Sequence, residues 1–136
     1  LFIAPQGVQL EVKGEGPFTV MGDPTRMTRA FNNLVQNALE SGASKPEVMV
    51  LLRKRGAHVE AGIRDNGEGI EPDRLSRIFE PKFTTKTHGL GLGLAMVRAI
   101  VQGAGGEVTV ESTPGEGSIF WVCLPFFQPE QDGSTA

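Results

Sequence analysis

The chain has 136 residues, a formal net charge of −3 and a single cysteine, Cys123. This length fits one domain with one core, and the slightly acidic balance gives no field that would favour nucleic acid as a partner. A lone cysteine excludes an internal disulfide framework, and its apolar neighbours predict a buried core thiol. Without a run of about 20 apolar residues or a signal-peptide pattern, we expect a cytoplasmic domain with no direct membrane insertion. Because the chain begins at Leu1 rather than Met, we expect it to be a piece of a longer protein.

Two short strands and a helix are predicted first. Residues 8–12 alternate apolar and polar side chains, and residues 18–21 offer a second strand after a turn. Asp23 followed by Pro24 is typical of a helix start, with a capping carboxylate before a proline at the first helical position. Apolar residues then recur at helical spacing until Ser41.

The middle of the chain alternates strand and helix signals. Residues 48–52 and 59–63 are predicted strands joined by a turn, and residues 72–79 are a predicted helix. The apolar residues of 80–91 have no clear helical or strand period, so this segment is predicted to be a loop. Loops of that length are usually functional. A third helix is predicted over about residues 92–103.

A hairpin of residues 107–111 and 118–124 ends the predicted domain, and the polar residues 128–136 are expected to be disordered. The order of elements predicts an α+β fold, a two-layer α/β sandwich with a mixed sheet of about five strands covered by about three helices.

Asn33 and Asn37 lie four residues apart at one edge of the apolar stripe of the first helix. Their amide oxygens suit a Mg²⁺ ion that bridges phosphates. The alternative is that both side chains face solvent or cap a neighbouring loop.

Asp65 ends a predicted strand and enters the turn Asn66-Gly67-Glu68-Gly69. Its carboxylate can accept a hydrogen bond from the amino group of adenine but would face the carbonyl oxygen of guanine. Such a bond contributes about 1.5–3 kcal/mol, and Gly67 and Gly69 would keep the wall clear of the base. The alternative is an ordinary tight turn.

Gly89, Gly91 and Gly93 lead directly into the third helix, so exposed amides and the positive helix end predict an anion site. The Rossmann fingerprint fails because Leu94 or Met96 stands where a third glycine is needed. The Gly-Lys-Ser/Thr of a P-loop is absent. Together with the asparagine pair and the first glycine turn, this pattern points to ATP.

Four motifs in this order resemble the catalytic ATP-binding domain of sensor histidine kinases, within the superfamily shared with DNA gyrase, Hsp90 and MutL. Residues 33–38 (NLVQNA) look like the N box, 65–70 (DNGEGI) like the G1 box, 79–86 (FEPKFTTK) like the F box and 89–94 (GLGLGL) like the G2 box. The F-box form is most similar to nitrogen-regulation-type kinases. The resemblance covers about residues 5–126 and implies a Bergerat-type ATP-binding domain over residues 1–127.

The resemblance implies ATP and Mg²⁺ as cofactors, with Asn37 and Asn33 as metal ligands and residues 80–91 as an ATP lid. The nucleotide-binding residues that it implies are Asn33, Asn37, Asp65, Gly67, Gly69, Ile70, Phe79, Thr84, Thr85, Lys86, Gly89, Leu90, Gly91, Leu92, Gly93 and Leu94. Glu40 and Ser41 stand where many members carry Lys or His, so Lys86 or Lys45 would have to contact phosphate.

In the hydrolase branches an acidic residue stands where this chain has Asn33, so hydrolysis is expected to be slow. Neither His58 nor His88 has the surroundings of a family phosphoacceptor. The expected partners are a phosphoacceptor-histidine dimerisation domain of the parent protein and a response regulator. An anti-sigma-type serine kinase and a regulatory ATP-sensing module are the alternatives.

Overall fold

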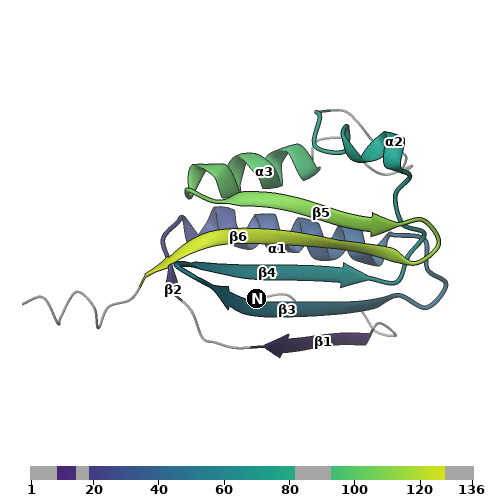
Figure 1. Cartoon of the computed structure of the whole chain (residues 1–136), viewed down its shortest axis with the longest axis horizontal. Helices are drawn as coiled ribbons and strands as arrows, with labels where there is room; N and C mark the ends of the chain where they lie inside the picture. Colours follow the sequence, from purple (N-terminus) through teal and green to yellow (C-terminus); the bar gives the residue numbers. More distant parts are fainter. Residues whose placement is uncertain (1–8, 15–18, 82–92, 128–136) are drawn as a thin grey trace, which may run out of the picture.

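The computed structural model describes residues 9–14, 19–81 and 93–127. Within them, helices pack on one face of a six-stranded sheet (Figure 1). The elements are β1 (Gln9–Gly14), β2 (Thr19–Val20), α1 (Pro24–Leu39), β3 (Glu47–Arg55), β4 (His58–Asp65), α2 (Pro72–Leu75), α3 (Gly93–Gly103), β5 (Glu107–Thr113) and β6 (Gly117–Phe127). The predicted α+β sandwich is confirmed. The lid from residue 82 onward and the tail at 128–136 lie outside the described residues.

The sheet is mixed, as predicted, because β1 pairs with β3 in parallel while the other pairs are antiparallel. Its order is β1-β3-β4-β6-β2, with β5 also paired to β6. The long strand β6 pairs with β4 along one edge; on its other edge it pairs with β5 and, near its end, with the two-residue strand β2. β6 therefore connects the last hairpin to the centre of the sheet.

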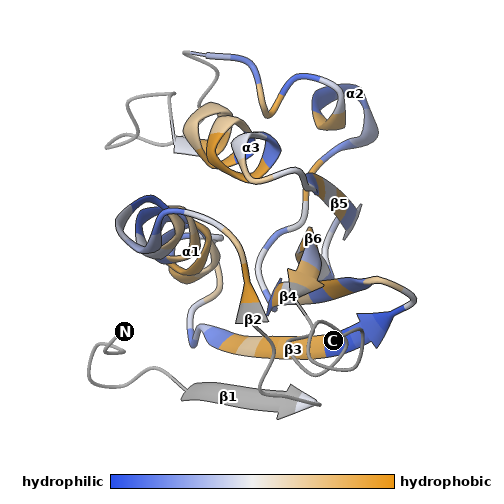
Figure 2. Cartoon of the chain, turned by 90° about the vertical axis from the view of Figure 1, so that its left-hand side faces the viewer, coloured by the Kyte–Doolittle hydropathy of each residue, from blue (hydrophilic) through white to orange (hydrophobic). Residues whose placement is uncertain are grey.

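Helix α1 begins as predicted at a capping carboxylate. Asp23 Oδ1 accepts hydrogen bonds from the backbone amides of Thr25 at 2.9 Å and Arg26 at 3.4 Å, and Pro24 occupies the first turn. The apolar side of the helix faces the sheet (Figure 2). Its buried residues are Ala30, Leu34, Val35 and Ala38.

Helix α2 is shorter than the predicted range 72–79 and ends at Leu75. Beyond it the backbone continues in tight i+3 turns, with the amides of Arg77 and Glu80 bonded three residues back. These turns bring Ile78 into the core and Phe79 edge-on to Phe120, with ring centroids 6.3 Å apart. Packing of these side chains therefore prevails over local helical periodicity.

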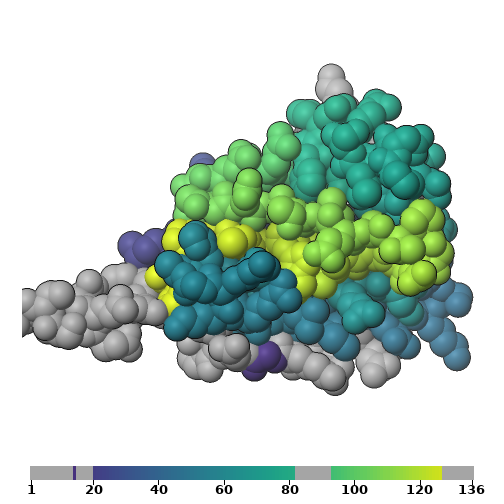
Figure 3. All heavy atoms as spheres, viewed as in Figure 1, coloured from purple at the N-terminus to yellow at the C-terminus, as the bar shows by residue number. Residues whose placement is uncertain are grey.

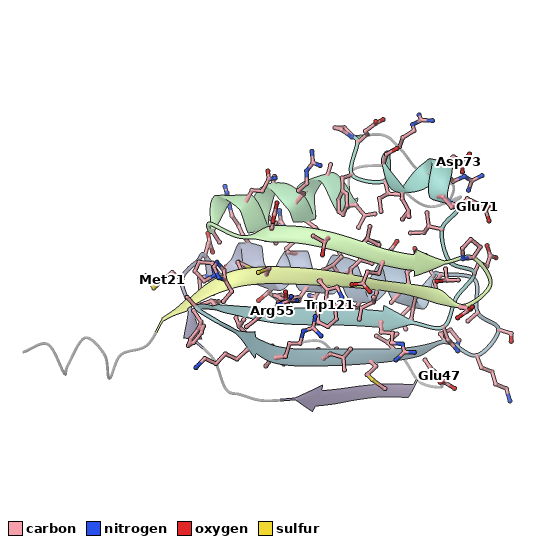
Figure 4. The ribbon with its side chains drawn as sticks, viewed as in Figure 1. Met21, Glu47, Arg55, Glu71, Asp73 and Trp121 are labelled. Carbon is pink, nitrogen blue, oxygen red and sulfur yellow. The ribbon has the colours of Figure 1, made fainter. Side chains whose placement is uncertain are left out.

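Trp121 lies on the face of the sheet away from the helices and is only 7% exposed, although it is not part of the main core cluster; Figure 3 shows this face and Figure 4 labels the residue. The Arg53 guanidinium lies 4.0 Å from the indole centroid and is paired with Glu60 at 2.7 Å. Cys123 is not in the core, contrary to the sequence prediction, because it alternates with the core residues of β6 and is only partly buried. Partial burial and then the charge of Glu60 raise the pKa of its thiol.

Among the described residues, no helix is both long and apolar enough to cross a bilayer.

Substitution of Asp23 by alanine should lower the free energy of unfolding by about 1 kcal/mol, because two amides in the first turn lose their acceptor. Glu71→Ala is the matched control, since Glu71 caps α2 without a side-chain hydrogen bond. It should change stability by less than about 0.5 kcal/mol. Urea unfolding of both variants measures the difference, and equal effects would contradict the assignment of the cap.

Candidate nucleotide-binding site

Asp65 is the last residue of β4 and is only 5% exposed. Its Oδ1 accepts hydrogen bonds from the backbone amides of Gly67 at 2.9 Å and Ser118 at 3.2 Å. Two amides that donate to one oxygen orient the carboxyl group. Because a carboxylate can accept about four hydrogen bonds, it can also receive a donor from a ligand.

The turn that follows Asp65 is held by three separate parts of the chain. The Asn66 side chain accepts from the amide of Glu47 at 2.9 Å and donates to the Lys45 carbonyl at 3.1 Å. Figure 4 labels Glu47 at this end of the sheet. The Glu68 amide donates to the carbonyl of Ser41, just beyond α1, at 2.8 Å. The Glu68 carbonyl accepts from Gly115 of the β5–β6 turn at 2.6 Å.

Neighbouring protein atoms leave no room for a side chain at the two glycines of this turn. Gly69 has a φ of +78°, and a methyl group added to it would lie 2.3 Å from the carbonyl oxygen of Thr113. A methyl group on Gly67 would lie 2.1 Å from Ser41 Oγ. The role of both glycines in clearance of a base stays a prediction, and the structure shows in addition that they let the turn contact the end of α1 and the hairpin.

Two hydroxyl groups of the last hairpin also hold the turn that follows Asp65 in place. The Ile70 amide donates to Ser112 Oγ at 2.7 Å, and Ser112 Oγ lies 2.7 Å from Ser118 Oγ. Sequence reasoning missed Ser112 and Ser118. The only available signal was Ser118 in the closing Gly-Ser-Ile-Phe segment, which marks the hairpin without indicating a contact to Asp65.

The asparagine pair lies on the other side of the site, on α1, which packs against both β4 and α3. Asn33 and Asn37 are both partly buried. A methyl group on Gly93, the first residue of α3, would lie 3.9 Å from Asn33 Oδ1, so the predicted N box adjoins the start of this helix. Leu94 on α3 packs partly against the core.

Asn33 also lines an open groove of about 460 Å³ along α1. The described residues that line it are Thr25, Thr28, Arg29, Asn32, Asn33 and Gln36. Arg29 is the basic member, one helical turn before Asn33, and the sequence analysis did not single it out. Lys45 is exposed in the segment between α1 and β3, where its carbonyl bonds Asn66.

Phe79 packs against Phe120 and lies 5.6 Å, measured to its ring centroid, from the guanidinium carbon of Arg98 on α3. Pairwise contacts thus connect the described parts of the four predicted motifs: Glu68 bonds Ser41 at the end of α1, Gly93 adjoins Asn33, and Phe79 lies beside α3. The predicted contacts Thr84, Thr85, Lys86, Gly89, Leu90, Gly91 and Leu92 lie outside the described residues.

Residues 22–128 match the family described as "Histidine kinase-, DNA gyrase B-, and HSP90-like ATPase". The chain belongs to this ATPase family. The sensor histidine kinase ZraS of Escherichia coli K12 is 42% identical over 106 residues, which are 78% of this chain and 23% of ZraS. This ATPase domain therefore spans about a quarter of that relative.

Solved structures agree with this family. The mycobacterial sensor histidine kinase MprB superposes with a TM-score of 0.80 at 31% identity, over 88% of this chain and 83% of that one. Full-length ShkA, solved in complex with AMPPNP, gives a TM-score of 0.77 at 30% identity, over 88% of this chain and 26% of that one. The fold is thus that of histidine kinase catalytic domains, and ATP is the nucleotide of the family.

Gly69→Ala should destabilise the domain more than Gly115→Ala. Both glycines have a positive φ, +78° and +84°, but a methyl group on Gly115 meets no atom within 4 Å. Gly115→Ala should therefore cost only the backbone strain of about 1–2 kcal/mol, and Gly69→Ala a further 1–3 kcal/mol or so from the clash with Thr113. Denaturant unfolding measures both, and equal losses would show that the hairpin contact does not constrain the turn.

Proposed function

We propose that this domain binds Mg·ATP and donates the γ-phosphoryl group to a histidine on a separate helical hairpin of its parent protein. An aspartate of a response regulator then receives the phosphoryl group from that histidine. The observation that carries the proposal is the buried carboxylate of Asp65, whose following turn is bonded at Glu68 to Ser41, just beyond the helix that carries Asn33 and Asn37. Relatedness to sensor histidine kinases supports the choice of acceptor.

Asp65 receives the 6-amino group of adenine in this proposal. The carboxylate is oriented by the amides of Gly67 and Ser118, so it is ready to accept without rearrangement. Guanine presents a carbonyl oxygen at the same position, and two facing acceptors in a buried site are unfavourable. Ile70, whose amide is fixed by Ser112, lies at the end of the same turn and would line the base.

Asn37 and Asn33 supply the neutral oxygen ligands for Mg²⁺, which binds few protein groups and is completed by phosphate oxygens. The start of α3 at Gly93 offers backbone amides and a positive helix end to the phosphates. Arg29, in the groove that it shares with Asn33, would supply positive charge. Thr84, Thr85, Lys86 and the glycine-rich residues 89–92 complete the proposed set.

Phosphoryl transfer suits these residues better than hydrolysis does. Asn33 stands where the resemblance places an acidic residue in the hydrolase branches, and an amide cannot take a proton from water at neutral pH. Transfer requires mainly positioning and electrostatic stabilisation, which a metal ion, backbone amides and an arginine provide. ATP is therefore retained for a protein acceptor.

Asp65→Asn should lower the affinity for ATP at least tenfold, which corresponds to about 1.4 kcal/mol. The amide is isosteric and can still accept from Gly67 and Ser118, but it presents a donor to the amino group of adenine. Calorimetry with ATP and with purine riboside triphosphate, which lacks that amino group, measures the effect. Only ATP should lose affinity, and an unchanged ATP affinity would refute the adenine assignment.

Addition of the purified helical hairpin of the parent protein should give acid-labile, base-stable phosphate on the hairpin when Mg·ATP labelled at the γ position is present. A hairpin in which asparagine replaces the acceptor histidine is the control and should stay unlabelled. Acid-stable label on a serine would indicate instead a kinase of the anti-sigma type. Tight ATP binding without any labelled acceptor would favour an ATP-sensing module.

A further inference from the structure

The hairpin of β5 and β6 carries none of the sequence-predicted site residues, yet its tip contacts the turn that follows Asp65. The Glu68 carbonyl accepts from Gly115 at 2.6 Å, and a methyl group on Gly117 would lie 2.2 Å from the carbonyl oxygen of Asp65. A methyl group on Gly69 would clash with Thr113 in the same way. The two turns therefore leave no room for an intervening side chain.

Ser112 lies near the end of β5, two residues before the hairpin turn at residues 114–116, and its hydroxyl connects the two turns. Its partly buried hydroxyl accepts from the Ile70 amide at 2.7 Å, lies 3.1 Å from the Gly117 carbonyl and 2.7 Å from Ser118 Oγ. A hydroxyl has one hydrogen and two lone pairs. All three contacts are satisfied together if Ser112 donates to Gly117 and accepts from both Ile70 and Ser118.

The two backbone segments that Ser112 connects each donate a hydrogen bond to the Asp65 carboxylate. Ser118, bonded to Ser112 through its hydroxyl, donates its own backbone amide to Asp65 Oδ1 at 3.2 Å. Ile70 ends the turn that begins at Asp65 and contains Gly67, the second amide on Oδ1. The hydroxyl of Ser112 thus constrains the two backbone segments that orient the Asp65 carboxylate.

We propose that Ser112 is a positioning residue for recognition of the adenine amino group: its hydroxyl fixes the Asp65 carboxylate through Ser118 and the turn that ends at Ile70. The inference rests on the proposed function, because it takes Asp65 as the contact to the base. Ser112 does not touch the nucleotide in this scheme. Its effect is on selectivity for the amino group, whereas a purely structural residue would affect every nucleotide alike.

The test compares ATP with purine riboside triphosphate, both with Mg²⁺, on the whole chain by calorimetry. Wild type should bind ATP at least tenfold more tightly than the analogue. In Ser112→Ala this preference should fall to threefold or less, mainly through weaker ATP binding, because the Ile70 amide and Ser118 hydroxyl lose their partner. Ser112→Thr, which keeps the hydroxyl and suits a strand, should restore the preference.

Thr109→Ala is the matched control, since it removes an exposed hydroxyl from the same strand, and it should leave the preference unchanged. If Ser112→Ala does not fold, Ser112→Cys keeps the site filled with a weak hydrogen-bonding group and should also reduce the preference. An unchanged preference in the folded Ala or Cys variant, or equal weakening of both nucleotides, would overturn the role of Ser112. A wild-type protein without preference for ATP would overturn the adenine assignment itself.

Discussion

Two backbone amides on one carboxylate oxygen are the interaction on which the candidate site depends. Asp65 is almost fully buried, and a buried charge is costly unless it is hydrogen-bonded. The amides of Gly67 and Ser118 meet that need and at the same time orient the group. Because one amide comes from the adjoining turn and the other from β6, the carboxylate joins the middle of the chain to its last hairpin. The nucleotide site and the sheet are therefore parts of one hydrogen-bonded structure.

The chemistry that we propose follows from what surrounds this carboxylate. Asn33 and Asn37 on α1 offer oxygens but no base, and Arg29 adds a positive charge in the same groove as Asn33. We propose that such a set binds and polarises a Mg·triphosphate without activating water. The ATPase family includes both kinases and hydrolase-type members, as its description states. In this chain the residue types favour storage of ATP for transfer to a protein acceptor.

Local sequence patterns predicted helices and strands well where a few neighbouring residues determine the structure. Asp23 and Pro24 start α1 as expected, since capping and the first turn involve only neighbouring residues. The predicted helix over 72–79 ended early because core packing of Ile78 and Phe79 prevailed over helical periodicity. Cys123 was wrongly assigned to the core because an apolar run does not reveal which face of a strand is covered.

The sequence by itself determined the kinds of chemical group available: an asparagine pair on a helix, a carboxylate at a strand end and glycine turns, each readable because it lies within a few adjacent residues. Only the tertiary structure decided how these groups are oriented. Ser112 meets Ile70 across 42 residues, and Ser118 meets Asp65 across 53. Contacts at such separations arise from strand register and hairpin packing, which no local pattern specifies, because each hydroxyl and amide could find other partners until the sheet has formed.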